Sequence, residues 1–300
     1  MTPAKRVPCS DQSLARNDQM FGTASAGMSW VLLELCGAWG KSAFLHSPEI
    51  IEPELGRAIV RRVEKAGMRI AAIRRPGRRP EPPRWRWFVA QSGVGSEALY
   101  CGEVSDPREY LDLALDGSGG TVSSDPVVAI CAHGKHDQCC AVRGRSACKA
   151  IAAEYPEYTW ECSHLGGDRF AATMLVLPEG LCYGRIDSSD SANLVRLYFD
   201  GRVDNRFLRG RTSLLHVVQA AQYFAREEYG DDRIASLHPI AVEDIAVEDV
   251  DGRTRVLLSG QAAPIEVILD HDMSEPLLSQ CHASVPGRVR VFTLVSIALA

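Results

Sequence analysis

The chain has 300 residues, of which 46% are hydrophobic and 24% charged, and its formal net charge is -5 at pH 7. This composition is typical of a globular protein with room for two modest domains, which excludes disorder as the default state. The mild acidity argues against a dedicated nucleic-acid-binding protein, which is usually basic. The most apolar run, residues 291–300, is far shorter than the roughly 20 residues of a membrane-spanning helix. We therefore expect no nucleic-acid partner and no membrane partner.

The N-terminal residues and the cysteine content predict the compartment. Polar residues follow Lys5 and Arg6 where a signal peptide would need an apolar segment, so we expect a cytoplasmic protein. In such a chain, ten cysteines indicate buried thiols, a metal site or redox chemistry rather than a disulfide framework. A thiol also packs as a small hydrophobe. On that ground we expect the following cysteines to be structural: Cys9, Cys36, Cys101, Cys148, Cys182 and Cys281.

The first half of the chain predicts an α/β layer, because strand and helix patterns alternate. A helix is predicted over residues 53–66, where Leu55, Ile59 and Val63 lie at helical spacing and Gly67 is a stop signal. Asp106 is the expected N-cap of a second helix. The predicted strands are residues 28–35, 69–73, 85–90 and 99–104, and the second helix is residues 107–115.

A glycine- and serine-rich linker, residues 116–124 (DGSGGTVSS), separates this half from the next. A long amphipathic helix is predicted over residues 213–229, capped by Thr212 and ended by Gly230. The other predicted elements are strands at 126–130, 171–177 and 181–186, helices at 146–154 and 191–199, and strands at 256–258, 265–269 and 289–295. The pattern predicts domains at 1–118 and 125–232 and a β-rich C-terminal extension at 236–300.

Two short segments concentrate metal-binding residue types. Residues 131–140 (CAHGKHDQCC) start where a strand ends and hold three cysteines, two histidines and an aspartate. Residues 160–170 (WECSHLGGDRF) also leave a strand and turn through two glycines. Two loops at the same end of a sheet can converge on one metal. Thiolate and imidazole suit zinc, copper or iron–sulfur chemistry, and the carboxylate is a harder ligand.

Several segments resemble the sucrase/ferredoxin-like family. They are CAHGKHDQCCAVRGR (131–145), WECSHLGGDRFAATMLVLPEGLCYGRI (160–186), GTASAGMSWVLLELCGAWG (22–40) and IRRPGRR (73–79). The resemblance extends from about residue 9 to residue 229 and is loose in the β-rich tail. It implies a thioredoxin-like ferredoxin domain that carries a [2Fe-2S] cluster. Both halves of the chain also share a loose strand-helix-hairpin-helix order, so we expect an α/β fold of two thioredoxin-like domains.

The resemblance also implies the cluster ligands. Fungal relatives use a Cys-x8-Cys pair followed by His-x3-His, which Cys131, Cys140 and His164 match, whereas Asp168 occupies the place of the second histidine. Asp168 is then an oxygen ligand, or the fourth ligand is Cys162 or Cys139, or the site is incomplete. With Asp168 as ligand the oxidised site has a charge of about -1, between the plant-type and Rieske values, and an intermediate potential is expected.

The resemblance implies an electron-transfer protein, more an electron carrier than a stand-alone enzyme. No flavin or nicotinamide motif is present in the sequence, so we expect a separate redox partner, either a reductase or an acceptor protein. Two alternatives stay open, a cluster-free thiol-disulfide oxidoreductase and a structural zinc-binding domain.

One basic segment, residues 69–86, contains seven arginines and four prolines. A nucleic-acid-binding arm has a similar composition. In an acidic chain we interpret the segment as a solvated loop, with a docking patch for an acidic redox partner as the second interpretation.

Overall fold

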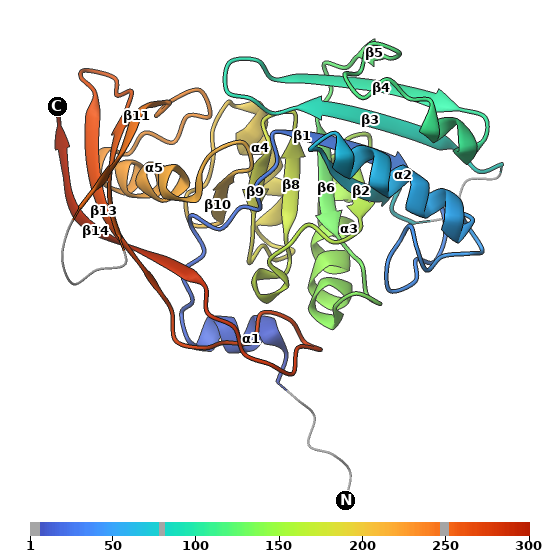
Figure 1. Ribbon diagram of the computed structural model, residues 1–300, viewed down its shortest axis with the longest axis horizontal. Coiled ribbons are helices and arrows are strands. Elements are labelled where there is room, and N and C mark those ends of the chain that lie inside the picture. Colours follow the sequence, from blue (N-terminus) through green and yellow to red (C-terminus); the bar gives the residue numbers. More distant parts are fainter. Residues whose placement is uncertain (1–6, 78–81, 247–251) are drawn as a thin grey trace, which may run out of the picture.

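A computed structural model describes residues 7–77, 82–246 and 252–300 (Figure 1). Its largest element is a mixed ten-stranded sheet in the order β10-β9-β8-β6-β7-β2-β1-β3-β4-β5. In chain order these strands are β1 (Ser29–Glu34), β2 (Arg69–Arg74), β3 (Trp85–Gln91), β4 (Ala98–Val104), β5 (Thr121–Val122), β6 (Val127–Cys131), β7 (Thr159–Cys162), β8 (Met174–Leu177), β9 (Leu181–Tyr183) and β10 (Leu208–Arg211). The predicted mixed α/β class is therefore confirmed.

The ten-stranded sheet consists of two halves with the same connectivity. In the N-terminal half, β1 and β2 are parallel neighbours, and β3 and β4 follow as antiparallel strands on the other side of β1. In the C-terminal half, β6 and β7 are parallel, and β8 and β9 follow on the other side of β6. The halves meet where β2 pairs antiparallel with β7. One continuous sheet thus joins the two predicted α/β domains, and the domain boundaries themselves stay a prediction.

The helices are short and few compared with the strands. They are α1 (Cys9–Ala15), α2 (Pro53–Lys65), α3 (Arg145–Glu154), α4 (Ser191–Phe199) and α5 (His216–Tyr229), with single turns at Pro107–Leu111, Cys140–Gly144 and Asp168–Phe170. Within the described ranges, no helix combines the length and the apolar composition needed to cross a membrane.

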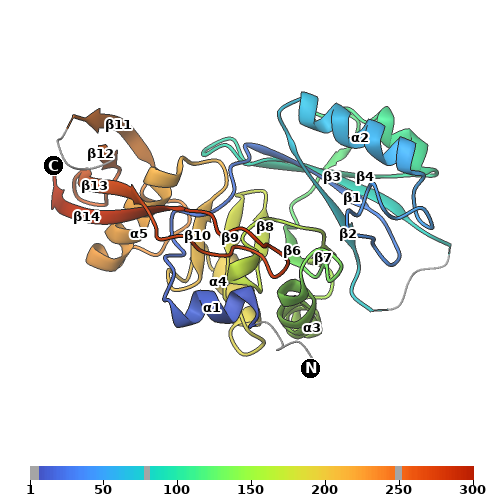
Figure 2. The same ribbon diagram turned by 60° about the horizontal axis from the view of Figure 1, so that its bottom comes forward.

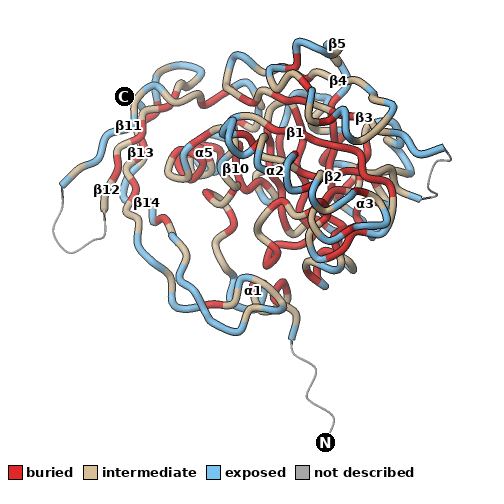
Figure 3. The backbone as a smooth tube through the Cα atoms, turned by 45° about the vertical axis from the view of Figure 1, so that its right-hand side comes forward, coloured by how far each residue is buried: buried red, intermediate tan, exposed pale blue. Residues whose placement is uncertain are grey.

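Each half of the sheet turns one face to its own helices and the other to a common core. In β1, Val31 and Leu33 pack with α2, whereas Trp30 and Leu32 face the common core. In β6, Val128 and Ile130 pack with α3 and α4, whereas Cys131 faces the common core. This division follows from the two-residue period of a strand. Figure 3 shows that the buried backbone is concentrated in this sheet.

A second, four-stranded antiparallel sheet forms the C-terminal extension. Its strands are β11 (Pro239–Ile245), β12 (Gly252–Leu258), β13 (Ile265–Met273) and β14 (Arg290–Leu299). It buries one face against α5. The connection between β13 and β14, residues 274–289, leaves this sheet and runs beside α1, as Figures 1 and 2 both show in red. Mutual hydrogen bonds between Leu277 and Gly287 make it a hairpin.

Most predicted elements are confirmed within a few residues, including the strands of both halves. Three details were wrong. The helix predicted at 107–115 is a short 3-10 helix, although Asp106 caps it as expected. The helix predicted from residue 213 begins at His216, because the Thr212 hydroxyl donates to the Gly27 carbonyl instead of capping it. The predicted linker contains β5, which extends the sheet beside β4.

Candidate functional site

The first metal-binding segment leaves β6 at the edge where β7 also ends. The two strands are parallel, with Cys131 paired to Cys162. After Cys131 the chain turns tightly, because the His133 carbonyl accepts the amide hydrogens of both His136 and Asp137. The Asp137 carboxylate then accepts the Cys139 amide at 2.8 Å. This bond precedes the helical turn Cys140–Gly144 that leads into α3, and it fixes the direction of the two adjacent cysteines.

The second segment leaves β7 and turns through two glycines in the left-handed region. Gly166 has φ of +89° and Gly167 has φ of +82°, a conformation that glycine adopts without strain. The guanidinium of buried Arg209 holds this turn by donating to the Gly166 carbonyl at 2.9 Å. The predicted turn is therefore confirmed, and it delivers Asp168 toward the Cys131–Cys140 loop.

Two of the other three predicted ligands, Cys140 and His164, contact the Asp168 carboxylate. Its Oδ1 atom lies 3.4 Å from the Cys140 Sγ and 3.0 Å from the His164 Nδ1. Cys140 is also hydrogen-bonded to Cys131, which raises the pKa of the Cys140 thiol, and burial raises it further. Cys131 and Cys140 are both fully buried. Asp168 thus contacts one sulfur and one nitrogen donor of the predicted set, and Cys131 adjoins it through Cys140. The donor atoms that all lie within 4.8 Å of one another here are those of His136, His164 and Asp168.

Asp168 is a buried carboxylate kept ionised by its neighbours. It is 2% exposed, and burial by itself would raise its pKa. Hydrogen bonds from His136 and His164 outweigh that effect and hold the pKa of Asp168 well below its ordinary value. The bond to Asp168 in turn raises the pKa of His136. The ionised form of Asp168 is therefore favoured, at a position that contacts one thiol and two imidazoles.

Two alternatives to Asp168 as fourth ligand have different surroundings. Cys162 lies beside Cys131 in the parallel pair, and burial raises the pKa of its thiol strongly. Cys139 points elsewhere, with its Sγ 3.6 Å from that of Cys9 and 3.2 Å from that of Cys281. A hydrogen bond from Cys9 lowers the pKa of Cys139 to about 6. The adjacent cysteines 139 and 140 thus belong to two different groups.

A family model described as sucrase/ferredoxin-like matches residues 22–210, well over half of the chain. The chain belongs to the sucrase/ferredoxin-like family. The matched residues span both halves of the large sheet and the whole group around Asp168, and they end before α5 and the C-terminal sheet. No curated protein and no solved structure matches this sucrase/ferredoxin-like chain.

Two polar neighbours of Asp168, Gln280 and His136, lie outside the predicted ligand set. Gln280, in the connection between β13 and β14, donates to the Asp168 Oδ2 at 3.0 Å. The His136 Nε2 lies 3.5 Å from the same oxygen, and its ring stacks on His164 with 4.0 Å between centroids. His136 is part of the segment singled out above, so the sequence held a signal for it. No sequence signal indicated Gln280, because it lies far from Asp168 along the chain.

His133, the other histidine of this segment, is turned away from Asp168. Its Nε2 lies 2.6 Å from the Gly40 carbonyl, and its ring packs edge-on against Trp39. Burial lowers the pKa of His133, which favours the neutral ring. His133 therefore joins the Cys131 loop to the N-terminal half.

The arginine-rich segment is not simply a solvated loop where the structure describes it. Arg74 pairs with Glu161 across the β2–β7 joint. Arg75 and Arg86 lie over the Trp160 ring at 3.8 and 4.9 Å. The earlier interpretation is wrong for these arginines, because aromatic faces and a carboxylate hold their guanidinium groups. Its part at residues 78–81 lies outside the described residues.

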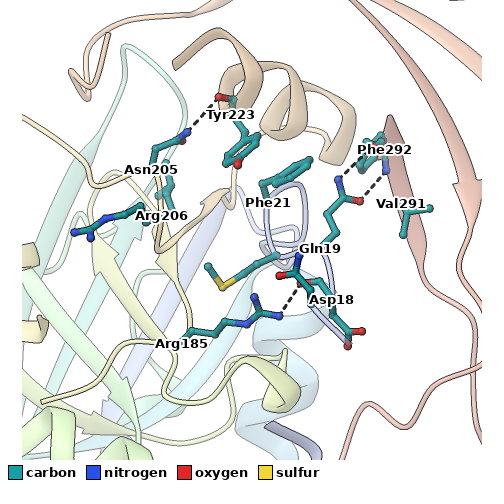
Figure 4. Close-up of a pocket in the computed structure, with 12 residues that line it drawn as sticks. Asp18, Gln19, Phe21, Arg185, Asn205, Arg206, Tyr223, Val291 and Phe292 are labelled. Carbon is teal, nitrogen blue, oxygen red and sulfur yellow. Dashed lines mark hydrogen bonds between the residues drawn. The ribbon is translucent and has the colours of Figure 1, made fainter. Parts of the chain in front are cut away.

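A pocket of about 410 Å³ lies between the N-terminal segment, α5 and β14 (Figure 4). Side chains in it bind backbone groups. Gln19 donates to the Phe292 carbonyl and accepts from the Phe292 amide, and Arg185 donates to the Asp18 carbonyl. The two bonds of Gln19 fix the start of β14 to the N-terminal segment. We therefore interpret this pocket as a gap at the interface between packed structural elements and not as a ligand site.

Proposed function

We propose that this chain is an iron–sulfur electron-transfer protein, with one [2Fe-2S] cluster held by Cys131, Cys140, His164 and Asp168. The observation that carries the proposal is the shared carboxylate oxygen, which lies within 3.4 Å of both a thiol and an imidazole. Soft thiolates with nitrogen and oxygen donors fit iron–sulfur ligation. A bound [2Fe-2S] cluster would supply reversible one-electron chemistry.

The protein residues would set the properties of that centre. The two thiols lie in the common core, so water is excluded on their side. Asp168 adds a negative charge at a site where screening by solvent is weak, and this charge favours the oxidised form. Gln280 and His136, which contact Asp168, would orient its carboxylate and partly offset its charge.

Exposure of the side chains indicates where a partner would approach. The His164 side chain is 32% exposed and that of His136 is 22% exposed, whereas that of Asp168 is 2% exposed. The imidazole edge is therefore the shortest route between solvent and the buried thiols. We propose that a separate reductase or acceptor protein docks there, in the cytoplasm.

A thioredoxin-like fold is part of the same proposal. Each half has a βαβ unit followed by a β-hairpin, with both hairpin strands on the far side of the first strand. The C-terminal half continues into a helix, α4, as a thioredoxin-like unit does.

The burial of the thiols favours the cluster over the alternative of a thiol-disulfide oxidoreductase. Such an enzyme needs an accessible thiolate to attack its substrate. Cys131 and Cys140 are both fully buried, and the pKa of Cys140 is raised. Both features oppose nucleophilic attack on an external disulfide.

The proposal is tested by iron and acid-labile sulfide analysis of full-length protein purified without air. We expect about two irons and two sulfides per chain, with visible charge-transfer absorption. Cys148→Ser serves as a control, because Cys148 lies on the buried face of α3, outside the donor group. Protein that contains zinc but no labile sulfide would contradict the proposal.

A further inference from the structure

A second cluster of metal-binding side chains lies beside the first and joins three distant parts of the chain. Cys9 opens α1, Cys139 ends the loop after β6, and Cys281 lies in the hairpin of residues 274–289. Asp137 completes the group, whose ligand atoms all lie within 4.8 Å of one another. Two of its cysteines, Cys9 and Cys281, were expected to be structural core residues.

The three sulfur atoms form a nearly equilateral triangle. Cys139 and Cys281 are 3.2 Å apart, Cys9 and Cys281 are 3.5 Å apart, and Cys9 and Cys139 are 3.6 Å apart. Tetrahedral zinc with bonds of about 2.3 Å to sulfur separates its thiolates by about 3.8 Å. Each sulfur would have to move by only a few tenths of an ångström to accept such an ion.

Asp137 holds the two loops that contribute Cys139 and Cys281. Its Oδ1 accepts the Cys139 amide and its Oδ2 accepts the Cys281 amide, both at 2.8 Å. The same two oxygens lie 4.0 and 3.9 Å from the Cys9 Sγ. Each oxygen keeps a second lone pair after these bonds. The carboxylate is therefore in position both to orient the cysteines and to complete a tetrahedral site.

We propose that Cys9, Cys139, Cys281 and Asp137 bind a structural Zn²⁺ ion, separate from the group around Asp168. Three thiolates favour a thiophilic ion, and a closed tetrahedral set of four protein ligands is the pattern of structural zinc. Cys9 and Asp137 are 1% and 2% exposed, so no open position for substrate faces solvent on their side. Both Cys9 and Cys281 lie outside the family match.

The bound zinc ion would hold the hairpin of residues 274–289 in place. Gln280, which donates to the Asp168 Oδ2, immediately precedes Cys281. An ion bound to Cys281 would fix this glutamine over Asp168 and hold the hairpin against α1. Most of the hairpin is exposed (Figure 3), so little apolar burial would hold it in place without the ion.

The test measures zinc and iron together in the full-length protein and its variants. We expect about one zinc ion per chain. Cys9→Ala and Cys281→Ala should each lower zinc at least tenfold and increase hydrogen exchange in residues 274–289. Cys101→Ala is the matched control, because Cys101 lies on β4, outside both groups, and its zinc content should equal that of the wild type. Cys131→Ser should keep zinc even where iron is lost, which separates this proposal from that of the cluster.

A cobalt titration of the wild-type chain keeps the test decisive if these variants fold poorly. Co²⁺ bound to three thiolates should give sulfur-to-metal charge-transfer absorption that one equivalent of zinc removes. Three results would each overturn the proposal: no bound zinc and no such absorption, zinc content unchanged in Cys281→Ala, or a Cys139–Cys281 disulfide in zinc-free protein purified with reductant.

Discussion

The two halves of the large sheet share one connectivity but differ in the loops that follow their first strands. After β1, the loop carries Trp39 and Phe44, which join the apolar core against α2. After β6, the corresponding segment carries cysteine, histidine and aspartate, and two of its side chains, His136 and Cys140, contact Asp168. The same backbone plan thus supports packing in one half and a donor group in the other, in agreement with the rule that function depends on the site and not on the fold.

Each half also contains a buried carboxylate next to its first parallel strand pair, Glu34 in one and Asp168 in the other, and their partners differ. Glu34 in β1 is fully buried and its Oε2 lies 2.9 Å from the Arg86 guanidinium. Asp168 in the other half contacts imidazoles and a thiol instead. A guanidinium remains charged and binds no metal, whereas imidazole and thiolate are metal ligands. The identity of its partner residues therefore decides whether a buried carboxylate forms an ion pair or joins a set of metal ligands.

The largest change in iron content should come from replacing the proposed cysteine ligands of the C-terminal half, with a cysteine of the N-terminal half as the control. Cys131→Ser and Cys140→Ser should each lower the iron content to less than about a tenth of that in the wild type, because hydroxyl oxygen replaces a thiolate ligand. Cys36→Ser, in the loop after β1, should leave iron unchanged, because a hydroxyl can keep the hydrogen bond to Glu34. Iron and sulfide analysis checks this contrast. A full cluster in Cys131→Ser would show that the ligands are different.

Variants of Asp168 should sharpen the contrast with Glu34. Asp168→Ala should lose or weaken the cluster. Asp168→His should keep it and raise its reduction potential by roughly 100 mV or more, because a negative charge is removed from a poorly screened site. Cys162→Ser should retain the cluster. Iron content and redox titration of these three variants decide the fourth ligand, since the reverse pattern would assign that role to Cys162.

One glycine in each half should have similar effects on stability and different effects on the cluster. A Cβ atom on Gly144 would lie 1.9 Å from the Cys131 carbonyl oxygen, and one on Gly56 would lie 2.0 Å from the Phe44 carbonyl oxygen. Gly144→Ala and Gly56→Ala should each lower the free energy of unfolding by about 2–3 kcal/mol. Iron content should fall only in Gly144→Ala. Gly119→Ala, where the nearest atom would lie at 3.8 Å, is the control for chemical denaturation.

The smallest effect concerns an ion pair that connects the halves, Glu97 with Arg211. Burial raises the pKa of Glu97, but the hydrogen bond from Arg211 outweighs it and the net pKa is lowered. The pair therefore stabilises the fold above the unfolded pKa of about 4.3, and this contribution is lost as the pH falls through the lower folded value.

Glu97→Gln should lower stability at pH 7 by about 1–2 kcal/mol, because buried Arg211 loses its carboxylate. The difference from the wild type should shrink below about pH 4. Denaturation at several pH values measures it. Glu54→Gln, at a side chain that is 84% exposed, should have almost no effect. An equal loss at pH 3 and pH 7 would contradict the assignment.

The sequence predicted those parts of the site that depend on local pattern. Strand ends and glycine turns were sufficient to predict that residues 131–140 and 160–170 meet, because parallel neighbouring strands end at one edge. It could not predict that Cys9 meets Cys281, a contact between residues 272 positions apart. That contact depends on how the hairpin of residues 274–289 leaves its sheet, and no residue pattern near Cys281 encodes its destination.

The same distinction explains the errors in the fold and the arginine-rich segment. Thr212 was predicted to cap a helix from local rules, but the Gly27 carbonyl, remote in the chain, takes its hydroxyl. Arg74 and Arg75 lie in a segment whose composition is typical of a loop. Glu161 and Trp160 from the other half nevertheless hold their guanidinium groups. Tertiary partners therefore decided the outcome wherever the local pattern was misleading.

The proposed ligand set is tested most directly by pulsed electron paramagnetic resonance of the chemically reduced full-length protein. The account predicts the signal of a reduced [2Fe-2S] centre with one strongly coupled imidazole nitrogen, from His164. The coupling should persist in His136→Ala, because His136 contacts Asp168 and is not a proposed ligand. Absence of the paramagnetic signal, absence of a coupled nitrogen, or two coupled nitrogens would contradict a cluster held by Cys131, Cys140, His164 and Asp168.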